Sequence, residues 1–123
     1  MKNKNQWIWM LILVVCIVPL TTISSRAEES PYKLTIQNHK FEPQLLVVPA
    51  NQKIKIHVEN QDSTPEEFES YELNREKIIP GKGKIILFIG PLKPGEYKYF
   101  GEFHPDTAQG IILAQENMEG GQK

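Results

Sequence analysis

The sequence predicts an all-β protein, a single antiparallel β-sandwich of seven or eight short strands. Apolar and polar residues alternate over short segments, most clearly in Ile54–Val58, and such alternation is typical of strands with one buried face. Turn residues separate these segments at intervals of roughly ten residues, as in other sandwiches. After residue 27 the chain shows no long run with the apolar period of an amphipathic helix.

Six segments carry a clear strand pattern, and turn residues lie between them. The strands are expected at Tyr32–Gln37, Gln44–Val48, Lys53–Asn60, Lys84–Ile89, Tyr97–Phe100 and Ile111–Gln115. Turns are expected at Asn38–Lys40, Ala50–Gln52, Pro80–Gly83 and Leu92–Gly95, where Gly, Pro and Asn favour chain reversal. The tail from Glu116 has little to bury and is expected to fray.

Glu66–Leu73 is the ambiguous segment. Its carboxylates could share a helix face, but Phe68, Tyr71 and Leu73 are too sparse an apolar set to hold a helix against a core. A short strand followed by an exposed loop is therefore the preferred interpretation.

The first 27 residues have the pattern of a secretory signal peptide. Lys2 and Lys4 give a positive start, Trp7–Val18 is apolar, and Ser25–Ala27 supplies small residues for cleavage. The apolar run is shorter than the roughly 20 residues that span a bilayer, so a retained N-terminal membrane anchor is the less favoured alternative. Residues 28–123 form one domain, because this length holds a single core.

The domain is mildly acidic and has no cysteine. Removing the signal segment leaves eleven Lys and Arg against fifteen Asp and Glu, a net charge of −4. Since there is no basic cluster, nucleic acid is not expected as a partner. The protein is expected to be a monomer. The only cysteine of the chain, Cys16, lies in the apolar run, so the domain has neither a disulfide nor a thiolate ligand.

His104 is the first candidate for a metal ligand. It follows the aromatic segment Tyr97–Phe100 in a loop, with Glu102 and Asp106 two residues to either side. Loops at the end of a rigid sandwich commonly display binding groups. A polar turn without any ligand is the alternative interpretation, because exposed loops are commonly acidic.

The segment after Pro65 supplies a second set of candidates. If it is extended, Phe68 points into the core and Glu66 points the same way. Glu67 and Glu69 then point outward. An inward carboxylate needs a partner, because an unpaired buried charge is costly, and a cation or the histidine of the later loop could be that partner.

The other two histidines of the domain are interpreted as solvated residues outside any site. His39 lies in a polar turn, and His57 lies on the polar face of an alternating strand. The sequence has no nucleophile–base motif, no phosphate-binding glycine loop and no Cys/His zinc spacing. Hydrolytic and phosphoryl-transfer chemistry therefore have no candidate residues.

Several motifs resemble those of a known family. They are Phe41-x-Pro43, Asn60-x-Asp62-Ser63-x-Pro65-x-x-Phe68, Leu92–Tyr97 and Phe103-His104-Pro105 followed by Gly110. Together they cover nearly the whole domain and are similar to the single-domain periplasmic cupredoxins. A more specific resemblance, to the small cupredoxin-like proteins that accompany bacterial high-affinity iron permeases, rests on Thr64–Ser70, Asn74–Glu76 and Phe103–Gly110. It implies an eight-stranded Greek-key sandwich, a periplasmic location and a role in iron uptake with a membrane iron permease.

The chain departs from the blue-copper members of this family at most ligand positions. Those proteins hold copper with two histidines, a cysteine thiolate and a weak axial methionine. Only His104 stands where the family has a ligand. Glu66 takes the place of the first histidine, Gly101 that of the cysteine, and Ala108 falls near the axial methionine. A type 1 copper site cannot form without the thiolate.

The donors that remain are one imidazole and several carboxylates. The candidate metal ligands are His104, Glu66, Glu102, Glu67, Glu69 and Asp106. A mixed nitrogen and oxygen set suits iron, manganese or a non-blue Cu(II) better than Cu(I). The expected cofactor is therefore an iron or copper ion.

Three functions fit these features. The first is a periplasmic iron-uptake accessory that binds iron or a non-blue copper and works with a membrane iron permease. Oxidation of Fe(II) needs an electron acceptor, and no residues of the sequence indicate one. Whether the protein is an enzyme is therefore left open. The second is a metal-free interaction module that docks on a membrane partner through the acidic stretch Glu66–Glu76. The third, a copper electron-transfer protein, is disfavoured because the cysteine ligand is missing.

Overall fold

The protein's structure, a computed structural model, describes residues 30–116, and within this range the chain forms strands and no helix. The strands are β1 (Tyr32–Gln37), β2 (Lys40–Glu42), β3 (Leu45–Pro49), β4 (Ile54–Asn60), β5 (Glu66–Ser70), β6 (Arg75–Ile79), β7 (Lys84–Ile89), β8 (Gly95–Gly101) and β9 (Gln109–Gln115). The all-β prediction is confirmed, with nine strands in place of seven or eight. The expected signal segment and most of the expected frayed tail lie outside the described residues.

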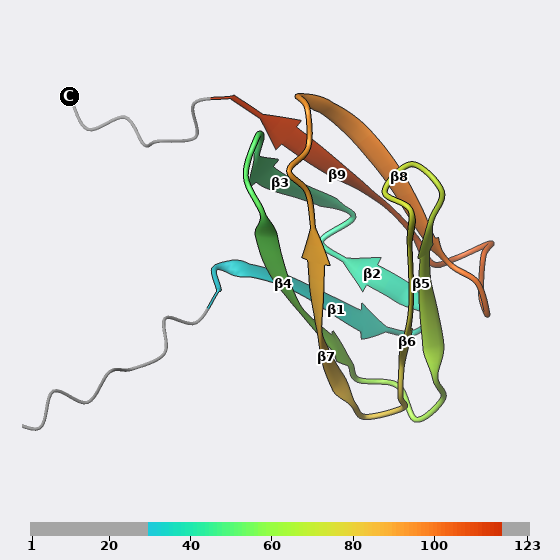
Figure 1. Ribbon diagram of the computed structural model, residues 1–123. Helices are drawn as coiled ribbons and strands as arrows, with labels where there is room; N and C mark the ends of the chain where they lie inside the picture. Colours follow the sequence, from blue (N-terminus) through green and yellow to red (C-terminus); the bar gives the residue numbers. More distant parts are fainter. Residues whose placement is uncertain (1–29, 117–123) are drawn as a thin grey trace, which may run out of the picture.

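The strands form two sheets packed face to face (Figure 1). One has the order β2-β1-β4-β7 and the other the order β3-β9-β8-β5-β6. The chain passes repeatedly from one sheet to the other, for example between β2 and β3 and between β4 and β5, which confirms the Greek-key sandwich. Two pairings, β1 with β4 and β3 with β9, are parallel, so the sheets are mixed and not purely antiparallel as expected. Within residues 30–116 no helix is long and apolar enough to cross a membrane.

A cluster of aromatic side chains in the core lies near one end of the sandwich. The rings of Phe68 and Tyr99 stack at 4.8 Å, and Phe41 meets Tyr99 edge-on at 5.0 Å. A Cβ at Gly110 would lie 2.2 Å from Cζ of Tyr99, so the ring can take this place only against a glycine. Three polar or glycine positions near this end follow or precede the aromatic residues by two positions. Phe41 anchors the segment of residue 39, Phe68 that of residue 66, and Tyr99 that of residue 101.

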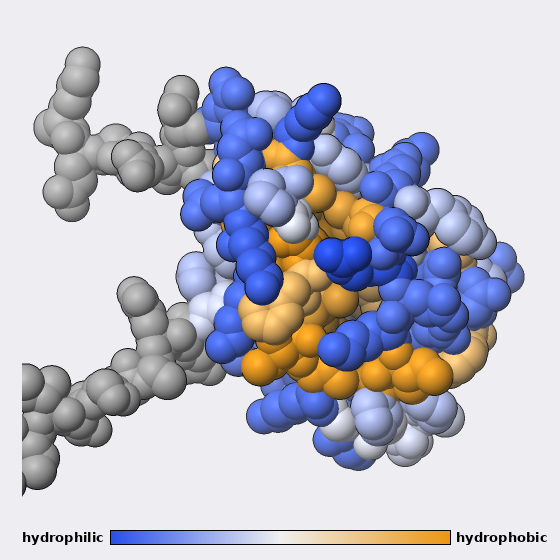
Figure 2. All heavy atoms as spheres, viewed as in Figure 1, coloured by the Kyte–Doolittle hydropathy of each residue, from blue (hydrophilic) through white to orange (hydrophobic). Residues whose placement is uncertain are grey.

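β6 and β7 are edge strands of different sheets and lie beside each other (Figure 1). The sequence predicted no strand over the residues of β6, of which only Ile79 is buried. Arg75 Nε donates to the carbonyl of Phe88 at 2.9 Å, and Lys77 Nζ donates to that of Ile86 at 3.2 Å. These bonds cover the exposed edge of β7. Figure 2 shows that apolar surface remains on this side of the molecule between polar side chains.

Candidate metal centre

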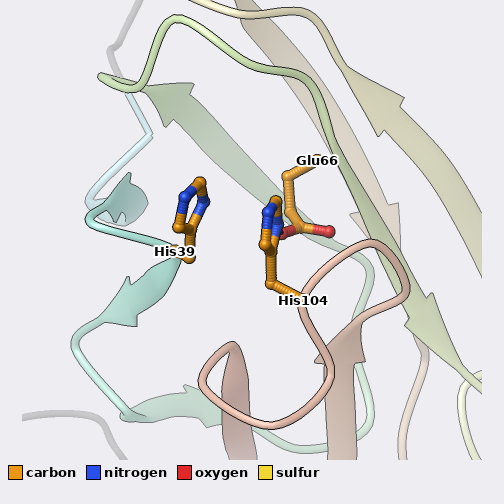
Figure 3. A group of neighbouring side chains, drawn as sticks. All are labelled: His39, Glu66 and His104. Atoms are coloured by element: carbon orange, nitrogen blue, oxygen red, sulfur yellow. Dashed lines mark hydrogen bonds and ion pairs between the residues drawn. The ribbon is translucent and has the colours of Figure 1, made fainter.

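Three side chains from separate segments meet at one end of the sandwich (Figure 3). His39 lies in the turn between β1 and β2 of the four-stranded sheet. Glu66 is the first residue of β5, and His104 lies in the loop between β8 and β9, both in the five-stranded sheet. One nitrogen of each histidine and one carboxylate oxygen of Glu66 all lie within 4.8 Å of one another. The group therefore bridges the two sheets.

Glu66 is buried and fully hydrogen-bonded. Its side chain points inward, as the strand parity predicted, and the residue is 1% exposed. Oε2 lies 2.7 Å from Nδ1 of His104, while Oε1 accepts the backbone N–H groups of Glu67 at 3.0 Å and Phe103 at 2.9 Å. Because an unpartnered buried carboxylate is costly, these contacts explain why an acidic residue is tolerated here.

The loop that carries His104 is folded back on itself. The carbonyl of His104 accepts the N–H of Ala108 at 2.9 Å and that of Thr107 at 3.2 Å. The N–H of Gly101 donates to the carbonyl of Ala108 at 2.8 Å and closes the base of the loop. This arrangement leaves the imidazole of His104 about one-third exposed, facing the pole of the sandwich.

Glu66 fills the space that a side chain at position 101 would need. A Cβ on Gly101 would lie 2.6 Å from Cδ and 2.8 Å from Oε1 of Glu66, and 2.6 Å from Cβ of Ala108. The resemblance expects a cysteine at position 101, and the carboxylate of Glu66 from the neighbouring strand fills the space that the cysteine side chain would need. The residues present do not fit a type 1 copper ion, which needs the thiolate.

His39 is a member of this group that the sequence interpretation missed. Asn38 and His39 have φ angles of 52° and 57°, as a two-residue hairpin turn with two left-handed positions requires. The rings of His39 and His104 stack with centroids 3.6 Å apart and planes 16° apart. His39 was expected to stand apart from the other candidates, but closure of the sandwich brings its turn against the loop of His104.

Asp62, in the loop between β4 and β5, holds the turn of His39. Its carboxylate accepts the backbone N–H of Asn38 at 2.8 Å and that of His39 at 2.9 Å. Oδ2 also lies 3.6 Å from Nδ1 of His39, which is longer than a hydrogen bond. Burial opposes ionisation, but the two backbone bonds and the nearby charges of His39 and Lys82 lower the pKa of Asp62 below its usual value.

Glu67 and Glu69, two further candidates, lie on the other face of β5 and belong to a second group. They and Glu76 of β6 each place a carboxylate oxygen within 4.8 Å of the others. Glu69 stands directly opposite Glu76 in the strand register. A hydrogen bond shared with Glu76, burial and the surrounding carboxylate charges raise the pKa of Glu67 to about 7. These residues are separated from Glu66 because alternate residues of a strand face opposite ways.

The last two candidates, Glu102 and Asp106, are exposed in the loop and belong to neither group. Burial and the charges of Glu76 and Glu102 raise the pKa of Glu69, so the charge of Glu102 acts on the second group. The six predicted ligands are therefore divided by the structure. Glu66 and His104 lie together and His39 joins them, whereas Glu67 and Glu69 lie together with Glu76.

Comparison with solved structures supports the fold. The chain is similar to amicyanin from Paracoccus versutus, with 15% identity, a TM-score of 0.54, and coverage of 68% of this chain and 80% of that one. It is similar to a purple cupredoxin from Nitrosopumilus maritimus, with 19% identity, a TM-score of 0.54, and coverage of 68% and 99%. It is also similar to auracyanin A, a "blue" copper protein from Chloroflexus aurantiacus, with 12% identity, a TM-score of 0.57, and coverage of 68% of this chain and 96% of that one. At these identities the likeness concerns the fold alone.

Two sequence comparisons extend over most of the chain. An uncharacterized protein of Rickettsia prowazekii (strain Madrid E) is 49% identical over 120 residues, which cover 94% of this chain and 96% of the relative. The family model described as the cupredoxin-like domain matches residues 9–114. The sandwich and these matches together show that the chain belongs to the cupredoxin-like domain family.

Proposed function

We propose that the protein binds iron, or a non-blue copper ion, through His39, Glu66 and His104, and that in the periplasm it works with a membrane iron permease. The observation that carries the binding proposal is the approach of one donor atom from each of these residues to within 4.8 Å of the others. Two imidazoles and one carboxylate are the donor set of non-haem Fe(II) sites, in which further coordination positions stay open. Open positions would allow a cargo ion to be released.

The geometry around Glu66 and His104 suits exchange of a proton for a metal ion. Oε2 and Nδ1 lie 2.7 Å apart, close to the separation of two adjacent ligands on an ion with bonds of about 2.0–2.1 Å. Binding of a metal there displaces the proton between the two atoms. The lone pair of an imidazole lies in its ring plane, so the stacked ring of His39 must tilt away from His104 before both can bind one ion.

The iron permease partnership rests on the family resemblance of Thr64–Ser70, Asn74–Glu76 and Phe103–Gly110. Export rests on the signal-peptide pattern of the first 27 residues. Electron transfer through a blue copper site is not supported, because Glu66 occupies the space beside Gly101. Oxidation of Fe(II) needs an electron acceptor, so binding and hand-over of the ion are the roles proposed for this chain.

Calorimetric titration of residues 28–123 with Cu(II), and anaerobically with Fe(II), tests the binding. We expect one ion per chain for the wild type and a large loss of affinity in both His39→Ala and His104→Ala. His57→Ala is the matched control and should bind as the wild type does, because His57 lies on β4 outside the group. Contrary to its interpretation as a solvated residue, His57 is half-buried, and its Nε2 is buried with no hydrogen-bond partner among the described residues. Equal binding by the wild type and His104→Ala would contradict the proposed site.

Uptake of radioactive iron by cells tests the pathway. Cells lacking this protein should take up less iron at low supply, and the wild-type gene, but not the His104→Ala gene, should restore uptake. If the wild-type protein binds no metal, the alternative is a metal-free module that docks through the acidic group of Glu67, Glu69 and Glu76. That alternative predicts permease binding that weakens steeply with added salt.

A further inference from the structure

Asp62 connects two parts of the molecule that supply different members of the proposed metal site. Its backbone belongs to the loop between β4 and β5, which ends at Glu66, the first residue of β5. Its carboxylate reaches across to the turn between β1 and β2, where it accepts the N–H groups of Asn38 and His39 at 2.8 and 2.9 Å. One loop therefore positions both the carboxylate donor and the turn of the first histidine.

The loop itself is fixed by a buried side chain. Asn60 is 1% exposed, and its Nδ2 donates to the carbonyl of Thr64 at 2.8 Å and to that of Ile79 at 3.3 Å. Its Oδ1 accepts the N–H of Asp62 at 3.0 Å. The N–H of Lys82 in turn donates to the carbonyl of Asp62 at 2.7 Å. With its backbone held on both sides, the carboxylate of Asp62 has little freedom to leave the turn.

The turn needs such support, because residues other than glycine seldom adopt left-handed backbone angles. Asn38 and His39 both do, with φ angles of 52° and 57°. Asp62 also places its negative charge 3.6 Å from Nδ1 of His39. This distance is longer than a hydrogen bond, but the negative charge attracts a proton to Nδ1 and so favours the tautomer that leaves the lone pair on Nε2.

We propose that Asp62 is a positioning residue for the metal site, which holds the turn of His39 and its Nδ1–H tautomer so that Nε2 carries the lone pair for the ion. This inference rests on the function proposed above. Loss of such an outer partner typically weakens metal binding about tenfold to a hundredfold. Asp62→Asn keeps the size of the side chain and removes its charge, and is therefore the test variant.

The experiment uses residues 28–123 with Cu(II) as the probe. Calorimetry should show a fall in affinity of about tenfold to a hundredfold in Asp62→Asn. Pulsed EPR of the Cu(II) complex should show two coordinated imidazoles in the wild type and a reduced His39 contribution in Asp62→Asn. Nitrogen-15 NMR of the metal-free protein should show the proton of His39 on Nδ1 in the wild type and a shift toward Nε2 in the variant. Glu59→Gln, which removes a carboxylate of β4 paired with Lys33, is the control and should change none of these.

A double variant separates positioning from a general loss of stability. If Asp62 acts through His39, Asp62→Asn should have no further effect on Cu(II) affinity in a His39→Ala background. An equal loss of affinity in both backgrounds, or an unchanged imidazole count and tautomer in Asp62→Asn, would overturn the inference while leaving the metal site itself in place. Absence of Cu(II) and Fe(II) binding by the wild type would instead overturn the proposed function, and this inference with it.

Discussion

At the scale of single residues, Glu66 and Gly101 depend on each other. The carboxylate of Glu66 is buried and takes up the volume that a side chain at position 101 would need. Its position in turn sets the partner of His104, because Oε2 lies 2.7 Å from Nδ1. An exchange at position 101 therefore changes the site without touching a donor atom.

Gly101→Ala should weaken metal binding and destabilise the fold. Its Cβ would lie 2.6–2.8 Å from Glu66 and 2.6 Å from Ala108, so the carboxylate must move away from His104. Overpacking of this kind costs about 1–3 kcal/mol of unfolding free energy. Urea denaturation measures the cost, and Cu(II) calorimetry measures the loss of affinity. Thr107→Ala, an exposed change in the same loop, is the control. Wild-type affinity in Gly101→Ala would show that the carboxylate is not a ligand.

At the scale of the strands, β5 separates its acidic residues by face. Glu66 points toward the histidines, whereas Glu67 and Glu69 lie on the opposite face beside Glu76 of β6. Like charges placed directly across a pair of strands are destabilising. A hydrogen bond with Glu76, burial, and the charges of the neighbouring carboxylates together raise the pKa of Glu67 to about 7.

Glu67→Gln should stabilise the protein at pH 8 but not at pH 5. The usual pKa of this carboxyl is 4.5 and its pKa in the fold is about 7, so between these values the folded state holds more protons than the unfolded state. Stability therefore falls as the pH rises through this window, and a neutral glutamine avoids that fall. Thermal melting at pH 5 and pH 8 measures the effect, with Glu96→Gln, a change of an exposed residue of β8, as the control. A difference between wild type and variant that does not change with pH would argue against the shifted pKa.

At the scale of the whole molecule, the proposed metal site joins the two sheets. His39 belongs to the hairpin of the four-stranded sheet, and Glu66 and His104 belong to the five-stranded sheet. An ion bound by all three would therefore tie the sheets together at one pole. The two sheets also meet along the edge strands β6 and β7. Within residues 30–116, the hydrogen bonds between these two strands come from the side chains of Arg75 and Lys77.

Metal binding should raise the melting temperature and protect both sheets. A ligand at a hundred times its Kd stabilises the folded state by about 2.7 kcal/mol, equivalent to about 10–20 °C in Tm for a domain of this size. Amide hydrogen exchange should slow in β1 and β2 as well as in β5. In His39→Ala, added protection should be confined to β5 and the His104 loop. Protection limited to the five-stranded sheet in the wild type would mean that His39 does not bind the ion.

The sequence by itself determined the all-β class, most strand positions and the inward direction of Glu66. These follow from local rules, since the two-residue period of a strand fixes which side chains share a face. The family resemblance added the Greek-key arrangement. The strand β6 was not found, because an edge strand with one buried residue in five has no alternating pattern.

Only the tertiary structure decided the parallel pairing of β1 with β4 and of β3 with β9, and the membership of His39 in the site. The turn of His39 was predictable from its residues, but its contact with His104 joins positions 65 residues apart in different sheets. The residues near either histidine do not predict this contact. It is set by how two buried faces close on one core, which is a property of the packed sandwich and not of any single segment.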